Sequence, residues 1–300
     1  MKDILGELSQ DQLEEKCLDH GFVKFIDCLP RVVPESEDGV DYAIAEAARC
    51  SYKRGTKTIS DDKVLIRYLM RHDHTSPFEM VKFKFHMKLP YFVARQMIRH
   101  RMVNVNELSG RYSEIPDEFY IPEENDVRSQ SEINKQGSDV RVDPILSEDF
   151  RGCLNIESAQ VHEVYKNFLG KNVAREQARM FLTLNYYTEW YWCIDLHNLL
   201  HFLDLRTDSH AQKETRVYAE AILKLITPIV PYTIEAWEDY SVYRGGLKLT
   251  KMEVDSIKKY FSGEDSNVSE IDVDSKLEKI EWIEKLKKIG AEKLLRKESK

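Results

Sequence analysis

The densest cluster of basic side chains in this sequence lies between positions 99 and 111. Its basic members are Arg99, His100, Arg101 and Arg111. Arginine binds phosphate through a planar pair of donors, and histidine adds a donor whose charge changes near neutral pH. Ser109 and Gly110 lie in the same stretch and permit a close approach of backbone to ligand. The cluster predicts a phosphate-type anion site at a helix end and the following loop. The alternative is a solvated basic helix end with surface ion pairs.

Two further clusters combine histidine with aspartate. His72 and His74 precede a predicted strand, where either a metal site or a hydrogen-bonded turn would fit. His197 and His201 are four residues apart and share one face of a predicted helix, a spacing that zinc could use. The metalloprotease pattern requires a glutamate directly after the first histidine, and Asn198 stands there. A His/Asp metal-dependent phosphohydrolase is therefore one alternative function, and ordinary polar histidines are the other interpretation.

Composition restricts the remaining classes of function. The 300 residues are 42% hydrophobic and 32% charged, which excludes fibrous and largely disordered chains. The formal net charge of −8 lacks the basic excess of a protein that coats nucleic acid polymers. No apolar run approaches the roughly 20 residues that span a bilayer, so we expect no membrane segment. The polar N-terminus shows no targeting sequence, and we expect a cytoplasmic protein.

Several common site motifs are missing from the sequence. The five cysteines are odd in number and none has CxxC spacing, which argues against a disulfide framework or a thiolate zinc site. No P-loop, GxGxxG or GxSxG motif occurs. If the protein binds a nucleotide, side chains must therefore hold its phosphates.

The secondary structure that positions these clusters can be predicted in part. Apolar residues alternate with lysine and histidine over 78–89, which predicts a strand, and a second strand is predicted over 21–29. Helical spacing predicts helices over 41–50, 91–102, 145–169, 173–182, 196–205 and 211–225, one after a cap at 60–62 and one after Pro231. The segment 184–194 fits strand or helix. We expect a polar helix or loose arm over 1–16 and a surface loop over 125–143.

A domain boundary is predicted at Gly245–Gly246. Residues 1–245 would form the main domain with an N-terminal arm. Residues 246–300 would form a charged linker and a C-terminal amphipathic helix, with an acidic flexible stretch over 262–275. The helix is indicated by apolar residues at helical spacing, namely Leu277, Ile280, Ile283 and Leu286.

The stretch Arg99–Tyr112 (RHRMVNVNELSGRY) resembles the signature of the flavin-dependent thymidylate synthases. In that signature Arg-His-Arg is followed, after seven residues, by serine, which is Ser109 here. Further blocks of similar sequence occur in the same order, namely HTSPFE, PYFVARQ, EFYIP and LDLRTDSHAQ. With their flanks these blocks span about Phe22 to Tyr240. The resemblance implies an α/β (α+β) fold with a central sheet flanked by long helices.

The resemblance also implies a reaction. Members of this family methylate dUMP to dTMP, taking the carbon unit from methylenetetrahydrofolate and the hydride from FAD that NADPH has reduced. They are homotetramers whose FAD sites are shared between subunits, and no metal is implied. The expected partners are therefore dUMP, folate, NADPH and further copies of this chain. The metal-dependent phosphohydrolase and a non-catalytic nucleotide-binding module remain the alternatives.

Residue by residue, the resemblance implies three groups. The catalytic group is Arg206, Ser109 and His74. The cofactor-binding group is Ser76, Arg99, His100, Arg101, Glu107, Asp195, His197 and His201. The dUMP-binding group is Gln96, Arg99, Glu107, Leu108, Ser109, Gly110, Arg111, Arg179 and Arg206. Arg206 would favour ionisation of the uracil ring, because a cation stabilises negative charge on the pyrimidine.

This sequence departs from the familiar bacterial pattern at three cofactor positions. Asp195, His197 and His201 stand where that pattern carries Asn, Arg and Asn. Histidine can donate as Asn or Arg does, but a carboxylate at Asp195 would be unfavourable beside a cofactor phosphate.

Overall fold

The computed structural model of the protein describes residues 1–37, 39–51, 61–132, 137–242, 246–264, 268, 271 and 275–291. The chain divides into two compact units, Met1–Arg244 and Gly245–Lys300. Among the described residues, no helix is both long and apolar enough to cross a lipid bilayer. All five cysteines are free.

The first unit is built on a five-stranded sheet in the order β2-β3-β5-β9-β6, with every neighbouring pair antiparallel. The strands are β2 (Glu14–Cys17), β3 (Gly21–Leu29), β5 (Lys82–Pro90), β9 (Tyr187–Asp195) and β6 (Asn104–Glu107). The predicted alternation is confirmed in β5, where Phe83, Phe85 and Met87 are fully buried and Lys82 and Lys84 are exposed. A sheet with one buried and one polar face requires helices on the buried face.

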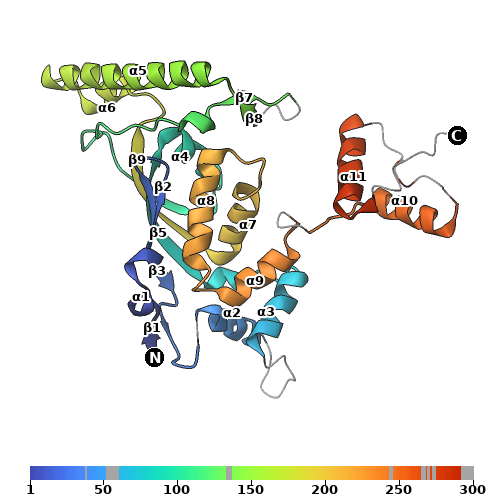
Figure 1. The fold of residues 1–300 in the computed structure, drawn as a ribbon. Coiled ribbons are helices and arrows are strands. Elements are labelled where there is room, and N and C mark those ends of the chain that lie inside the picture. Colours follow the sequence, from blue (N-terminus) through green and yellow to red (C-terminus); the bar gives the residue numbers. More distant parts are fainter. Residues whose placement is uncertain are drawn as a thin grey trace, which may run out of the picture. The chain divides into compact units, whose positions relative to one another are not determined.

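Helices cover that face and form the main hydrophobic core with it. The covering helices are α4 (Tyr91–Met97), α7 (Leu196–Arg206) and α8 (Lys213–Ile226), and α8 runs beside the sheet in Figure 1. A group of helices lies at one end of the unit, namely α2 (Asp41–Arg49), α3 (Asp62–Arg71) and α9 (Pro231–Tyr240). The long α5 (Pro144–Gly170) lies at the opposite end, with the short α6 (Arg175–Ala178) beside it (Figure 1). The predicted central sheet with helices is confirmed.

Several predicted elements differ from the structure. The strand predicted over 78–89 begins at Lys82, because Phe78–Met80 forms a 3₁₀ turn after Pro77. The helix predicted over 91–102 ends at Met97, and the backbone then tightens: the amides of Arg99 and His100 donate to the carbonyls three residues earlier. Arg99–Arg101 therefore lies in the connection to β6 and not on a helix. The undecided segment 184–194 is strand β9.

Strand pairing explains two of the other differences. The predicted N-terminal arm contains β2, which pairs with β3, and β1 (Lys2–Asp3), which pairs with β4 (Val32–Val33). The predicted loop 125–143 contains the paired strands β7 (Arg128–Gln130) and β8 (Ser138–Arg141). The helix predicted over 173–182 is divided into α6 and a 3₁₀ turn, Arg179–Phe181.

The described residues of the second unit form two helices and a small core. The helices are α10 (Lys251–Ser262) and α11 (Lys276–Lys288); the sequence predicted only the latter. The buried residues are Val268, Ile271, Trp282 and Leu286. Trp282 Nε1 donates to the Val268 carbonyl at 2.8 Å, and Lys285 Nζ lies 2.8 Å from Glu253 Oε1. The predicted linker 262–275 is described only at 262–264, 268, 271 and 275.

Candidate functional site

The register of the sheet brings the Arg-His-Arg connection to the start of α7. Asn104, the first residue of β6, is paired with Cys193 of β9. Two residues later β9 ends at Asp195, and α7 begins at Leu196. Residues 99–103, which lead into β6, therefore approach the same end of the sheet as the N-terminus of α7.

His100 makes the closest recorded contacts between these two segments. Its ring centroid lies 5.7 Å from that of His201 and 5.7 Å from that of Phe202. The His100 Nε2 atom is buried and has no hydrogen-bond partner among the described residues. Burial lowers the pKa of His100, and the charges of His201 and Arg206 lower it further. The structure thus brings His100, His201 and Arg206 together.

Arg206, the last residue of α7, is partly buried and forms no ion pair with any described residue. Burial lowers the pKa of its guanidinium, which nevertheless stays charged because an arginine does not lose its proton in a protein. A buried cation without a counter-ion is unfavourable. This position therefore favours an anionic or strongly polarised ligand.

Asp195 has a role that the sequence analysis missed. It is the N-cap of α7: Oδ1 accepts from the Asn198 amide at 2.9 Å, and Oδ2 accepts from Asn198 Nδ2 at 2.8 Å. Its negative charge is therefore compensated by the positive end of the helix dipole and by two donors. The expected conflict between Asp195 and a cofactor phosphate is reduced accordingly. His197, in the first turn of α7, is half-buried.

The second part of the candidate site is a tight turn after β6. The Leu108 amide donates to the Glu189 carbonyl at 2.8 Å, which continues the pairing with β9. The Ser109 carbonyl accepts from two amides, those of Tyr112 and Ser113, both at 3.0 Å. The Ser109 hydroxyl accepts from the Arg111 amide at 3.3 Å. We call residues 107–111 together with Arg179 the cradle.

Gly110 is what allows Arg179 to join the cradle. A Cβ atom at position 110 would lie 3.0 Å from Ile115 Cδ1 and 3.2 Å from Arg179 Cδ. Both distances are tighter than ordinary van der Waals contact, so a larger residue would push one neighbour away. The structure therefore places Arg179 directly against the turn.

A hollow of about 210 Å³ adjoins the cradle. It is lined by Tyr91, Ala94, Arg95, Ile98, Glu107, Leu108, Arg179 and Trp190. Glu107 Oε1 accepts from the Thr188 hydroxyl at 2.8 Å, which fixes the carboxylate at its rim. Sequence reasoning missed Tyr91, Arg95 and Trp190. No residue pattern around them indicated a binding role, although Arg95 is the neighbour of Gln96 in the PYFVARQ block.

Two further members of the predicted dUMP-binding group have partners in the structure. Gln96 Oε1 accepts from the Thr215 hydroxyl of α8 at 2.8 Å, which orients the amide and leaves its NH₂ for a ligand. Arg111 Nε lies 3.0 Å from Glu176 Oε2, and the two side chains are 61% and 53% exposed. An ion pair this exposed is weak, so a phosphate could replace Glu176.

His74 and Ser76 lie in the exposed turn between α3 and Phe78–Met80. The His74 ring is 5.9 Å from Tyr68 and 6.3 Å from His72. The strand that follows is tied to α7, since the Val81 carbonyl accepts from the Leu196 amide at 2.8 Å. The turn therefore belongs to the same end of the sheet as His100. No group of three or more His, Cys, Asp or Glu side chains within the described ranges could hold a metal ion.

Several arginines of this region form no ion pair with the described residues, as is also true of Arg71, Arg128 and Arg175. In the described part of the chain no ion pair is formed by Arg95, Arg99, Arg101, Arg179 or Arg206. The sequence has 52 acidic against 44 basic residues, so carboxylates are plentiful elsewhere. Five arginines without ion pairs in the described structure, gathered around the cradle and His100, favour a site for anions.

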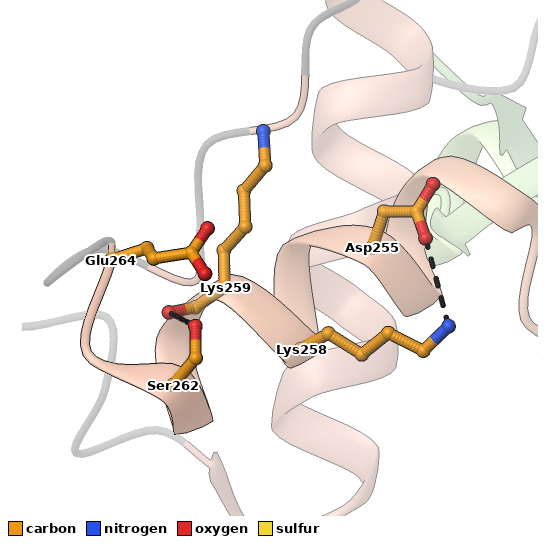
Figure 2. A pocket seen from close by; sticks show the side chains of 5 residues that line it. All are labelled: Asp255, Lys258, Lys259, Ser262 and Glu264. Atoms are coloured by element: carbon orange, nitrogen blue, oxygen red, sulfur yellow. Dashed lines mark hydrogen bonds and ion pairs between the residues drawn. The ribbon is translucent and has the colours of Figure 1, made fainter.

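Another hollow lies in the second unit. It is lined by Asp255, Lys258, Lys259, Ser262 and Glu264. Figure 2 shows the lysine of one pair directed at its aspartate, with Lys258 Nζ 3.9 Å from Asp255 Oδ1. Its two lysines are balanced by two carboxylates, so it lacks the excess positive charge of the region around His100 and the cradle.

Comparisons with known proteins agree with these features. Residues 32–232 match the family described as thymidylate synthase complementing protein. A protein of Dictyostelium discoideum named flavin-dependent thymidylate synthase is 49% identical over 256 residues, covering 85% of this chain and 82% of its own length. One from Wolbachia pipientis wMel with the same name is 49% identical over 269 residues, covering 90% and 89%.

A solved structure shows the same fold. The UMP/dUMP methylase PolB from Streptomyces cacaoi, bound with 5-Br dUMP, aligns with a TM-score of 0.65 and 28% sequence identity. The alignment covers 76% of this chain and 98% of that chain.

Proposed function

Because this chain belongs to the flavin-dependent thymidylate synthase family, we propose that it methylates dUMP to dTMP. The carbon donor would be methylenetetrahydrofolate, the flavin FAD and the reductant NADPH. The single observation that carries the proposal is the group of unpaired arginines around Arg206 and the cradle in an acidic protein. A similar structure binds 5-Br dUMP, which supports a pyrimidine nucleotide as the ligand. We propose residues 1–245 as the catalytic domain.

The cradle supplies the phosphate-binding part of the proposed site. Arg179 and Arg111 provide fork-shaped donors, and the turn at Ser109 brings backbone and hydroxyl groups close to them. Leu108 and Trp190 provide apolar surface in the adjoining hollow, and Glu107 provides an acceptor. This combination of a cationic end and an apolar wall suits a nucleotide monophosphate better than a free anion.

Arg206 is the proposed electrostatic catalyst. Its guanidinium is partly buried and has no carboxylate partner among the described residues, so no described counter-ion weakens its field. Directed at the uracil, it would stabilise the negative charge that develops on the ring. Ser109 would hold the nucleotide in the orientation that this requires, and His74 would border the flavin and folate region.

The residues around His100 fit an anionic cofactor. The buried and unpartnered Nε2 atom of His100 is a donor or acceptor that a ligand could satisfy. Arg99 and Arg101 flank it without ion pairs in the described structure, and His197, His201, Ser76 and Glu107 would complete the contacts. Bound FAD would supply the hydride chemistry. The chain's part is to bind and orient the cofactor and to keep positive charge near the pyrimidine.

The proposed cofactor-binding residues lie far apart in one copy of the chain, which favours an assembly of several copies. His100 precedes one end of β6 and Glu107 stands at the other, about 10 Å along the strand. Helix α5 and the residues after it also expose large apolar side chains, among them Ile145 (72%), Ile156 (55%), Met180 (77%) and Leu184 (66%). Exposed apolar surface of this kind marks interaction sites. We therefore propose a homotetramer in which neighbouring copies complete each FAD site.

An absorption spectrum tests the proposal. The purified protein, incubated with FAD and freed of excess, should keep the absorption of oxidised flavin. NADPH should bleach it, faster when dUMP is present, and added methylenetetrahydrofolate should then give dTMP. Sedimentation velocity should show a tetramer. A protein that retains no flavin and forms no dTMP would refute the proposal, and metal analysis with a phosphatase assay would then test the phosphohydrolase alternative.

A further inference from the structure

Helix α5 holds the segment that follows the cradle through the backbone amide and carbonyl of Ile115. The Ile115 amide donates to the Tyr165 hydroxyl at 3.0 Å. The Ile115 carbonyl faces His162 Nε2 at 3.4 Å. All three residues are buried, at 2%, 0% and 3% exposure respectively. Since buried backbone groups need partners, this part of the chain depends on two side chains that lie about 50 residues away in sequence.

The side chain of Ile115 packs against Gly110 of the cradle, so the position of Ile115 affects the position of the turn. Its Cδ1 atom stands 3.0 Å from the position of a Cβ at Gly110, and Arg179 Cδ stands 3.2 Å from the same point. Gly110 therefore lies between Ile115 and Arg179 with no spare space. A shift of Ile115 would change the position of the turn relative to the arginine.

The attachment is reinforced from the other side of His162. Its ring stacks on Tyr186 with centroids 5.8 Å apart, and its buried Nδ1 lies 3.2 Å from Asp117 Oδ2 without a hydrogen bond to any described residue. Tyr186 in turn donates from its hydroxyl to the Ser158 carbonyl at 2.7 Å. His162 thus has little freedom to follow Ile115 if that residue moves.

We propose that Tyr165 and His162 are positioning residues for the nucleotide phosphate. They hold Ile115 so that Gly110 and Arg179 keep the spacing that the phosphate requires, and neither touches the ligand itself. The inference rests on the proposed function, because it assigns to these residues the dUMP affinity of the cradle. Loss of one of the two buried contacts leaves a backbone group without a partner, and relaxation of the turn then relieves that cost.

This role predicts a particular kinetic pattern. The cradle binds the phosphate, which does not react, so its contacts are equally strong in the ground state and the transition state. Disturbing it should raise the KM for dUMP and leave kcat nearly unchanged. For a single buried hydrogen bond the expected loss of dUMP affinity is about 5- to 30-fold.

Tyr165→Phe tests the proposal against a matched control, Tyr218→Phe. Tyr218 is equally buried, and its hydroxyl donates to the Lys88 carbonyl at 2.8 Å in the main core, without contact to residues 109–115. For each flavin-loaded variant we would measure dUMP binding by calorimetry, KM and kcat, flavin content and melting temperature. We expect Tyr165→Phe to weaken dUMP binding about 5- to 30-fold with flavin content retained, and Tyr218→Phe to lower stability alone.

A second pair of variants covers the case in which Tyr165→Phe does not fold. His162→Gln keeps an N–H donor for the Ile115 carbonyl and should retain wild-type dUMP affinity, whereas His162→Leu should lose it. Equal dUMP affinity in wild type, Tyr165→Phe and His162→Leu would overturn the inference and leave the proposed function intact. Equal weakening by Tyr218→Phe would also overturn it. A wild-type protein that binds FAD but not dUMP would instead overturn the proposed substrate, and this inference with it.

Discussion

The two parts of the candidate site rest on hydrophobic cores of very different size. The region around His100, Arg206 and the N-terminus of α7 is built on the main core, to which α7 contributes Leu199, Phe202 and Leu203. The cradle is built on a separate cluster whose fully buried members are Ile115, Tyr165, Ala178 and Tyr186. Local stability follows the buried apolar contacts. The cradle should therefore be the softer part, and it gains rigidity from the polar attachments to α5.

The arginines of the two parts also differ in burial. Arg206 is partly buried and forms no ion pair with a described residue, which suits a cation that acts on a reacting ring. Arg111 and Arg179 are exposed, and Arg111 has an exchangeable partner in Glu176. The comparison suggests a division of labour, with catalysis on the rigid part and adjustable binding on the soft part. It also predicts that substitutions in the two parts will affect kcat and KM differently.

The largest expected effect is that of Arg206→Ala. Removing the buried cation should lower kcat for dTMP formation by at least about 10²- to 10³-fold, the usual cost of one preorganised charge-stabilising group. Flavin content should stay largely unchanged, because the main core and His100 remain. The measurement is dTMP formation from labelled dUMP, with Arg216→Ala, whose side chain pairs with Glu220 on α8, as the control. Near-normal turnover in the Arg206 variant would refute its assignment.

Gly110→Ala should weaken substrate binding by the cradle. The added methyl group would meet Ile115 Cδ1 at 3.0 Å and Arg179 Cδ at 3.2 Å, so one of them must move. We expect about tenfold weaker dUMP binding, consistent with an overpacking cost of one to a few kcal/mol, and an unchanged kcat at saturation.

The second substitution Ile115→Val sharpens this test, because it removes the Cδ1 atom nearest to the new methyl group. The double variant should recover part of the dUMP affinity. If Gly110→Ala lowers kcat as strongly as Arg206→Ala does, the proposed division between the two parts is wrong.

Local patterns predicted the strands and helices that carry the site better than they predicted the site itself. The alternation over β5 was enough to identify a strand, since Phe83, Phe85 and Met87 signal one buried face. Strand β6 was missed because Asn104–Glu107 contains one apolar residue and exists through its pairing with β9. Helix α4 was extended too far because its end depends on 3₁₀-type bonds, which leave no clear mark in the sequence.

Site residues were predictable where they lie in one motif and not where the fold brings them together. The Arg-His-Arg motif and the turn at Ser109 could be located from their types and spacing. Asp195 was interpreted as a liability, although the predicted helix over 196–205 begins directly after it and an aspartate there is a common N-cap. The attachment of Ile115 by His162 and Tyr165 links segments about 50 residues apart. No local sequence pattern predicts these buried hydrogen bonds.

A moderate effect of pH on protein stability is expected from His100. Burial, with help from His201 and Arg206, lowers the pKa of His100 below its ordinary value of 6.5, while the Asn198 backbone and Asp195 oppose the shift. The unfolded chain then binds a proton near pH 6.5 that the folded protein takes up only at lower pH. Stability should therefore fall as the pH drops below about 6.5. His100→Gln should reduce that fall in a series of thermal melts, and an identical slope in both proteins would contradict the assignment.

The smallest expected effect is that of Glu176→Gln on the soft part. The ion pair between Arg111 and Glu176 is more than half exposed on both sides and contributes less than about 1 kcal/mol, so unfolding should hardly change. In the substrate complex, however, Glu176 competes with phosphate for the same guanidinium. Its removal should therefore tighten dUMP binding about twofold, and the gain should shrink at high salt as screening weakens the competing pair. Calorimetric titrations at low and high salt would measure it. Weaker dUMP binding in this variant would mean that Glu176 holds Arg111 in position for the phosphate, and the cradle would then be less adjustable than its exposure indicates.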